Sequence, residues 1–152
     1  MIKIGIDPGV TGAIAALDAD NRLIDVFDMP VVQDGKKRRV NAPELAAIIG
    51  AICSGAGQYH AYVEKVGAMP GQGVTSMFNF GRSAGIIDGV LGALHIPLTY
   101  VSPQKWKKAA GLIGKEKDQG RTRAIELYPS APLNLKKHIG RADAILISRF
   151  GI

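Results

Sequence analysis

At residues 2–13 stands the segment IKIGIDPGVTGA, an apolar run that ends on the carboxylate of Asp7 and turns at once through Pro8 and Gly9. Apolar and β-branched residues before a Pro-Gly break predict a buried strand followed by a tight turn. A carboxylate at the end of an interior strand is costly unless its charge is compensated, and a metal ion is the usual compensation. Asp-Pro-Gly sequences also occur where the Asp caps a turn, so this segment alone leaves both interpretations open.

The composition of the chain is that of a globular protein. It has 152 residues, of which 47% are hydrophobic, enough for one domain with a substantial core and too few for two large lobes. No apolar run reaches the ~18 residues of a membrane span, and the first residues lack the pattern of a secretory signal. Cys53 is the only cysteine, which excludes an internal disulfide framework and a cysteine zinc cluster and fits a reducing cytoplasm.

The charge of the chain is unbalanced. The net charge is +6, and a basic excess of this size indicates a polyanionic partner, most often a nucleic acid. The cations are clustered, which argues against ordinary solubility charge. They form four blocks, at residues 36–39, 105–108, 115–123 and 136–141.

The hydrophobic pattern predicts an α/β protein with a mixed sheet covered by helices, in a single domain over residues 1–152. Residues 29–40, which hold the first basic block, are predicted to be an exposed loop. Asn41 has the side chain of a helix N-cap. The predicted strands are residues 2–7, 12–17, 22–28, 61–66 and 96–101, and the predicted helices are residues 43–54, 74–94, 104–110, 117–127 and 141–149.

Three acids stand in apolar surroundings. Asp7 and Glu64 lie on predicted strands, and Asp143 lies early in the last predicted helix. Magnesium prefers hard oxygen ligands such as these, and two such ions about 3.5–4 Å apart stabilise both the attacking and the leaving oxygen in phosphodiester hydrolysis. The plainer interpretation of Glu64 is a residue of an edge strand that faces water.

Together these stretches resemble the RuvC family of Holliday junction resolvases, especially its phage-type members. The family belongs to the RNase H-like nucleases. The resemblance rests on six motifs in order: IGIDPGVTG at residues 4–12, YVEKV at 62–66, MPGQG at 69–73, FNFGR at 78–82, VSPQKWKK at 101–108 and ADA at 142–144. It implies an RNase H-like fold, with helices on both faces of a five-stranded mixed sheet whose second strand is antiparallel to its neighbours. It also implies an endodeoxyribonuclease that resolves four-way DNA junctions in the cytoplasm of a bacterial or phage-infected cell. Its cofactor would be Mg²⁺, with Mn²⁺ as a substitute.

The resemblance also assigns roles to residues. Asp7 and Glu64 become metal ligands on adjacent strands, and Asp143 completes the metal site from the last helix. Lys107 and Lys117 match basic residues near the scissile phosphate, although Lys115 aligns equally well with the second of these. Phe78 and Phe80 fall where the family carries aromatic residues near the junction centre, with core packing as the alternative. The residues expected to bind DNA are Lys36, Lys37, Arg38, Arg39, Phe78, Phe80, Arg82, Lys105, Lys108 and Lys115.

The sequence departs from the family at one place. Many relatives carry an acid or a His one turn before the last acid, whereas this chain has Ile139 and Gly140 there. His138 is the nearest group that could ligate a metal or activate water. Its other interpretation is a solvated member of the last basic block. The departure leaves a non-catalytic DNA-binding module of the same fold as an alternative function.

A second alternative comes from residues 7–12, which also resemble the first phosphate-binding turn of actin- and Hsp70-like ATPases. The chain length and the missing later motifs argue against such an ATPase fragment. We also expect a homodimer, because resolving a nearly two-fold symmetric junction needs two symmetric cuts. The predicted helix at 74–94 is the candidate interface, unless its small residues pack on its own sheet. A stripe with three- or four-residue spacing marks one face of it: Gly81, Gly85, Gly89 and Gly92.

Overall fold

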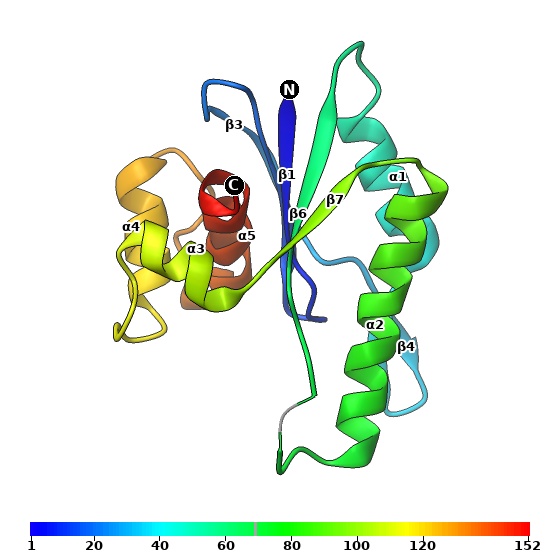
Figure 1. The fold of residues 1–152 in the computed structure, drawn as a ribbon. Helices are drawn as coiled ribbons and strands as arrows, with labels where there is room; N and C mark the ends of the chain where they lie inside the picture. The colour runs from blue at the N-terminus through cyan, green and yellow to red at the C-terminus, as the bar shows by residue number, and fades with distance from the viewer. Residues whose placement is uncertain (69) are drawn as a thin grey trace.

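Five strands in the order β3-β2-β1-β6-β7 form the central sheet of the computed structural model, which describes residues 1–68 and 70–152 (Figure 1). Met69, part of the motif at 69–73, lies outside the described residues. The strands of the sheet are β1 (Ile2–Asp7), β2 (Ala13–Leu17), β3 (Leu23–Asp28), β6 (Tyr59–Glu64) and β7 (Leu98–Val101). The helices are α1 (Ala42–Ile52), α2 (Val74–Ala93), α3 (Pro103–Ala110), α4 (Gln119–Leu127), α5 (Ile139–Phe150) and the short 3₁₀ helix η1 (Lys136–His138).

The sheet is mixed, as predicted. Strand β2 runs antiparallel to both β1 and β3, whereas β6 runs parallel to β1 and to β7. The hairpins of β1, β2 and β3 need only short turns, while the parallel pairs are reached through crossover helices. The predicted five-stranded mixed sheet with helices on both faces is confirmed.

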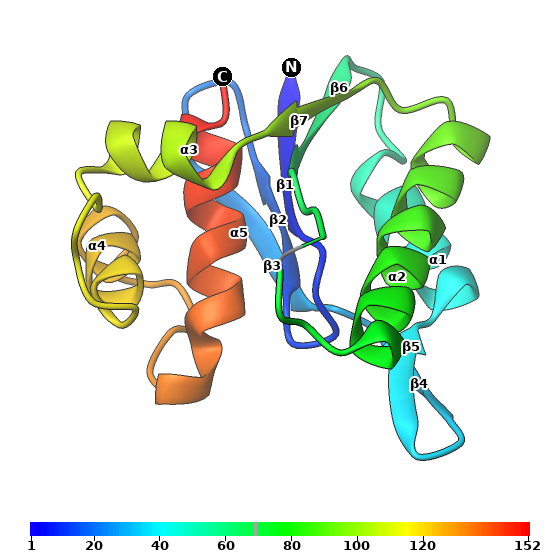
Figure 2. The ribbon, with the colours of Figure 1, turned by 60° about the horizontal axis from the view of Figure 1, so that its bottom comes forward.

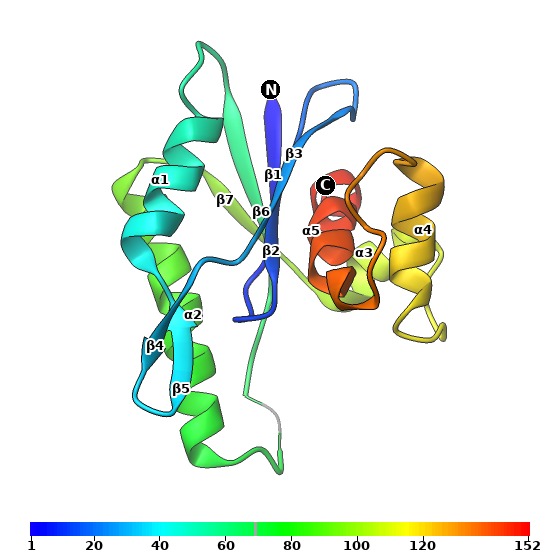
Figure 3. The same ribbon diagram turned by 180° about the vertical axis from the view of Figure 1, so that it is seen from behind.

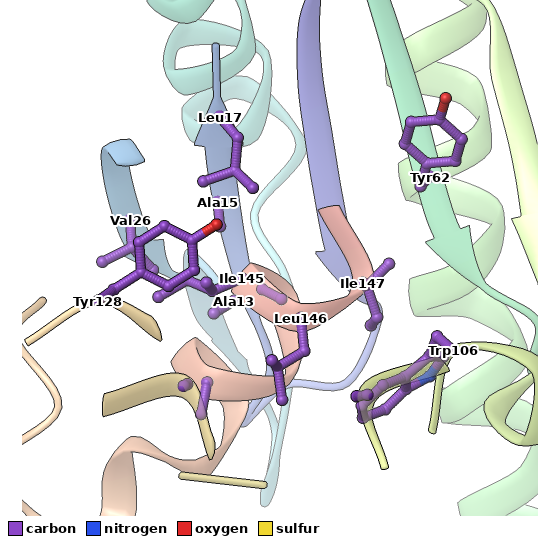
Figure 4. Close-up of a cluster of buried hydrophobic side chains, with 14 of the residues drawn as sticks. Ala13, Ala15, Leu17, Val26, Tyr62, Trp106, Tyr128, Ile145, Leu146 and Ile147 are labelled. Carbon is purple, nitrogen blue, oxygen red and sulfur yellow. The ribbon is translucent and has the colours of Figure 1, made fainter. Parts of the chain in front are cut away.

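Two hydrophobic clusters fill the two faces of this sheet, and Figures 2 and 3 show the helices divided between them. Helices α1 and α2 cover one face, where Leu45 and Leu91 join Ile4 and Ile6 of β1. Helices α3, α4 and α5 cover the other, where Ile145 and other α5 residues join the side chains of β2 (Figure 4). Alternate side chains of a strand point to opposite faces, so the central strands are buried on both sides.

Helix α5 approaches β1 very closely. A Cβ at Gly5 would lie 2.1 Å from the backbone oxygen of Ala144 and 2.4 Å from the backbone nitrogen of Ser148. The hydroxyl of Ser148 donates a hydrogen bond to the backbone oxygen of Lys3 at 2.8 Å. Only glycine at position 5 allows this contact, which fixes the height of α5 above the strand that ends at Asp7.

The predicted loop at 29–40 is wrong, because this segment forms a hairpin of β4 (Val31–Asp34) and β5 (Lys37–Val40). Its two-residue turn starts at Gly35, whose φ of 61° lies in the left-handed region. Gly at the first position of a two-residue turn is a hairpin signal, which the basic block concealed. Arg82 of α2 pairs with Asp34 at 2.7 Å and ties the hairpin to that helix.

The other predicted elements exist, with bounds that differ by a few residues. The largest shift is at β6, which spans Tyr59–Glu64 instead of residues 61–66, so Glu64 ends the strand. The predicted cap of α1 is confirmed, because the Asn41 side chain accepts a hydrogen bond from the backbone of Glu44. Within the described residues, no helix combines the length and the apolar character needed to cross a lipid bilayer.

Candidate active site

Asp7 and Glu64 end two neighbouring parallel strands. Ile6 of β1 is paired with Val63 of β6, so the next residue of each strand is one of these acids. Because parallel strands end at the same edge of a sheet, both carboxylates lie at this edge. The expectation of adjacent strands is confirmed, and both side chains are partly buried.

The surroundings of Asp7 disfavour its negative charge. Burial and the charge of Glu64 raise its pKa from 3.8 to about 6. The backbone N–H of Gly9 and the charges of Lys117 and Lys107 act in the opposite direction. The turn after β1 is tight, because a Cβ at Gly12 would lie 2.1 Å from the backbone oxygen of Asp7. Glycine there lets the turn close around the acid.

Asp143 comes to the same place from α5. Burial and then the charges of Asp7 and Glu64 raise its pKa from 3.8 to about 7, opposed by Lys107 and Lys117. Three carboxylates from β1, β6 and α5 therefore interact with one another and with the same two lysines. The sequence motifs predicted these five groups, and the fold brings them into one electrostatic cluster.

The lysines belong to a pocket of about 250 Å³ beside Asp143. Lys107 comes from α3, and Lys117 comes from the segment before α4. Lys115 also lines the pocket, but only Lys107 and Lys117 are among the charges that act on both acids. This placement favours Lys117 over Lys115 as the second basic residue of the site.

Trp106 is a neighbour of the site that sequence reasoning missed. Its indole Nε1 donates a hydrogen bond of 2.7 Å to Oε2 of Glu64. The motif at 101–108 contained this residue, and a single tryptophan inside a basic helix was the available signal. The sequence could not show which strand its indole would face.

Position 140 cannot hold the acid found in many relatives of the RuvC family. A Cβ at Gly140 would lie 2.4 Å from the backbone oxygen of Thr11 and 3.0 Å from the Cα of Gly12. The backbone of α5 thus rests directly on the turn that follows Asp7. A side chain at position 140 would therefore collide with this turn.

His138 has different neighbours from the three acids. It is buried, and its Nδ1 accepts a hydrogen bond from the backbone N–H of Leu135 at 3.3 Å. Burial and the nearby Arg141 lower the pKa of His138, while Asp28 raises it. The solvated interpretation of His138 is wrong, and its interpretation as a ligand or base finds no support in these contacts.

The acids suit a divalent cation by their chemistry. Burial and mutual repulsion raise the pKa values of Asp7 and Asp143, and a hard cation with oxygen ligands would favour their charged forms. Within residues 1–68 and 70–152, no group of three or more His, Cys, Asp or Glu side chains is arranged to hold a metal ion. Magnesium is usually held by one or two carboxylates, with water and substrate phosphate completing its octahedron, so the residues present fit this ion.

The residues expected to bind DNA fall into two regions. Lys36, Lys37 and Arg38 line a groove of about 440 Å³ together with Phe80. On the other side of the sheet, Lys105 and Lys108 are exposed on α3. Figure 2 shows the β4–β5 hairpin and α3 on opposite sides of the sheet.

Four of the expected DNA-binding residues have surroundings that the sequence left open or did not show. Phe78 is 69% exposed and Phe80 36% exposed, so the core-packing alternative for them is wrong. Arg39 Nε lies 3.4 Å from Asp34, which also holds Arg82, so both arginines brace the hairpin.

The fold of this chain is similar to that of solved structures. Two solved structures from Thermus thermophilus align with nearly the whole chain. RuvC in complex with a Holliday junction substrate has a TM-score of 0.65 at 16% identity, over 97% of this chain and 90% of that one. This chain has the RuvC fold. A second RuvC structure gives a TM-score of 0.57 at 15% identity, over 99% of this chain and 94% of that one.

A sequence comparison gives a Holliday junction resolvase as a relative of this chain. The chloroplastic Holliday junction resolvase MOC1 of Chlamydomonas reinhardtii is 28% identical over 158 residues, which cover 89% of this chain. The chain spans only 18% of the length of that relative. No family model matches the sequence. The predicted RNase H-like fold of the RuvC type is confirmed.

Proposed function

We propose that this chain is a divalent-metal-dependent endodeoxyribonuclease that resolves four-way DNA junctions, with a role in DNA recombination and repair. The observation that carries the proposal is the convergence of Asp7, Glu64 and Asp143 with Lys107 and Lys117 at one edge of a RuvC-type sheet. The MOC1 relative is named for this activity. Residues 1–152 would form one nuclease domain, since both hydrophobic clusters share the same sheet.

The acids and the lysines have complementary tasks in this proposal. Carboxylates among Asp7, Glu64 and Asp143, completed by water and substrate phosphate, would hold Mg²⁺ or Mn²⁺. The ion would supply an activated water and stabilise the leaving oxygen. Lys107 and Lys117 are placed to attract the scissile phosphate and to offset the repulsion between its charge and the acids. The charges of both lysines lower the pKa values of Asp7 and Asp143, which supports their placement beside the acids.

DNA would contact the chain on both sides of this edge. The groove between the β4–β5 hairpin and α2 offers cations beside Phe80, and the exposed Phe78 lies one turn from the start of α2. Bases stack on such rings at about 1–3 kcal/mol each. Lys105, Lys108 and Lys115 would hold the phosphates of another arm, with an affinity that falls steeply with salt.

A homodimer would supply two such sites to one junction. Gly81, Gly85, Gly89 and Gly92 are exposed on α2, and a Cβ at any of them would meet no atom of the described residues within 4 Å. The alternative that this stripe packs on its own sheet is therefore wrong. An open glycine stripe lets two helix backbones approach closely. A cytoplasmic location stays a prediction, since MOC1 is described as chloroplastic.

Cleavage of a synthetic four-way junction tests the proposal. We expect symmetric cuts with Mg²⁺ or Mn²⁺, none in EDTA, and none in a linear duplex of the same sequence. Asp7→Asn should lose cleavage while keeping junction affinity in EDTA, since an amide preserves the shape and removes the charge. Asp20→Asn, at an exposed turn, is the charge-matched control and should cut normally.

Each other result points to a different function. Tight binding without cleavage under every metal condition would indicate the non-catalytic DNA-binding module. If Asp7→Asn lost binding together with cleavage, Asp7 would have a folding role. If the protein neither bound nor cut the junction, the whole proposal would be overturned.

A further inference from the structure

Trp106 is the largest fully buried side chain beside the acids and the only tryptophan in the chain. It lies at the edge of the cluster beneath α5, where Figure 4 shows it apart from the side chains of β2. Most residues of that cluster are purely apolar, but an indole carries an N–H that must find an acceptor when it is buried. The acceptor is Oε2 of Glu64, at 2.7 Å.

The start of α3 explains how the indole reaches this carboxylate. Val101, the last residue of β7, is the register partner of Glu64. Ser102 follows at once and caps α3 by accepting a hydrogen bond from the backbone of Lys105 at 3.2 Å. Trp106 and Ala110 form the buried face of this helix. The helix therefore begins beside Glu64 and turns Trp106 toward it within its first turns.

The ring of Trp106 also contacts a second group of the site. The ammonium of Lys107 lies 5.3 Å from the centroid of the indole, within the range of a cation–π interaction. The same ammonium acts on both Asp7 and Asp143. One buried side chain thus contacts an acid through its N–H and a base through its ring.

We propose that Trp106 is a positioning residue, which fixes the carboxylate of Glu64 and the ammonium of Lys107 in the arrangement that metal binding and phosphate contact require. This role rests on the proposed nuclease function. An indole N–H is a single donor, so it holds one carboxylate oxygen and leaves the other to bind an ion. Groups that orient metal ligands in this way commonly change metal affinity or activity by about 10- to 100-fold when they are removed.

Nuclear magnetic resonance tests the contact without any cleavage assay. A ¹⁵N-labelled sample has one indole N–H resonance, because the chain has one tryptophan. We expect Mg²⁺ alone to shift this resonance in a saturable way. Glu64→Gln should move the resonance without metal and abolish its response to Mg²⁺. A resonance that ignores both Mg²⁺ and Glu64→Gln would overturn the proposal, whether or not the protein cuts junctions.

Trp106→Phe tests the consequence, because it keeps an aromatic ring and removes the N–H. We expect junction cleavage about 10- to 100-fold slower, a higher Mg²⁺ concentration for half-maximal rate, and unchanged junction affinity in EDTA. Ile147→Val trims the same buried cluster and leaves every donor of the site in place. It should keep the wild-type Mg²⁺ dependence.

The two experiments separate the possible failures. If Trp106→Phe kept the Mg²⁺ dependence of Ile147→Val, the positioning role would be wrong. If Trp106→Phe did not fold, the resonance of the wild-type indole would still decide. A resonance that responds in a protein that cuts no junction would overturn the nuclease function and leave the contact with Glu64 standing.

Discussion

Helices α5 and α2 lie on opposite faces of one sheet and use glycine in opposite ways. On the α5 side, Gly5 and Gly140 are places where a Cβ would collide with backbone atoms at 2.1 and 2.4 Å. On α2, four exposed glycines would meet no described atom within 4 Å. At α5 the glycines let backbone segments of the same chain pack closely together, whereas no segment of the described chain packs on the α2 glycines. The α5 side therefore fixes the position of the acid cluster, and the glycine stripe of α2 is exposed where the proposed dimer would form.

The largest expected effect is the contrast between two Gly-to-Ala substitutions, one on α5 and one on α2. Gly140→Ala should destabilise the protein by about 3 kcal/mol or more, because the backbone of Thr11 cannot move away easily. Gly85→Ala should instead stabilise the monomer by about 0.5–1 kcal/mol, as expected for Gly to Ala in an exposed helix. Urea denaturation of both variants measures the contrast. Equal effects would remove the distinction between the two helices.

Removing a charge from α5 should stabilise the metal-free protein at neutral pH. The pKa values of Asp7 and Asp143 are about 6 and 7 in the folded state, above the usual 3.8, so the folded state holds more protons between about pH 4 and 7. Their contribution to stability is therefore lost as pH rises through this window. Asp143→Asn should avoid the part of this loss that comes from charging Asp143, on the order of a few kcal/mol in the free energy of unfolding.

Urea denaturation in EDTA at pH 5 and pH 8 checks this sign. Asp143→Asn should gain on the wild type at pH 8 and gain little at pH 5. The difference between the two proteins isolates the carboxylate, because the lowered pKa of His138 acts in the opposite direction in both. Mg²⁺ should raise the free energy of unfolding of the wild type at pH 8 and have little effect on that of Asp143→Asn. A constant difference across pH would contradict the charge explanation.

A bulky charge on the open stripe should separate assembly from folding. If the protein forms the proposed homodimer through α2, Gly85→Arg should shift it to monomer at micromolar concentration with little change in unfolding, since the position faces open space. Sedimentation velocity, with and without junction DNA, measures it. Asp20→Arg, on the exposed turn between β2 and β3, controls for added charge. An unchanged dimer in Gly85→Arg would exclude this stripe as the interface.

The smallest effect is expected at the start of α5. His138→Gln should leave the cleavage rate within about twofold, because His138 contacts the backbone of Leu135 and its electrostatic neighbours are Arg141 and Asp28, not the three acids. The Mg²⁺ and pH dependence of cleavage should also stay the same. A large loss of cleavage rate with unchanged thermal stability would show that His138 has a role in the active site.

The sequence was informative where side-chain type and strand pattern agreed. Asp7, Glu64 and Asp143 were predicted because carboxylates are conspicuous in apolar elements. The sequence concealed features that depend on contact between distant segments. The β4–β5 hairpin was missed because the charges of Lys36 and Lys37 outweighed the turn signal of Gly35. The bond from Trp106 to Glu64 could not be predicted, because it depends on where α3 begins relative to β7.

The contact between Gly140 and the turn after Asp7 also has a consequence for biosynthesis. Asp7 leaves the ribosome before the helix that carries Asp143, since chains emerge N-terminus first. The acid cluster is therefore complete only after α5 has docked on β1. A chain stalled before α5 would expose the hydrophobic face of β2 and would lack Asp143. In the proposed nuclease, such an incomplete chain would be unable to cut DNA.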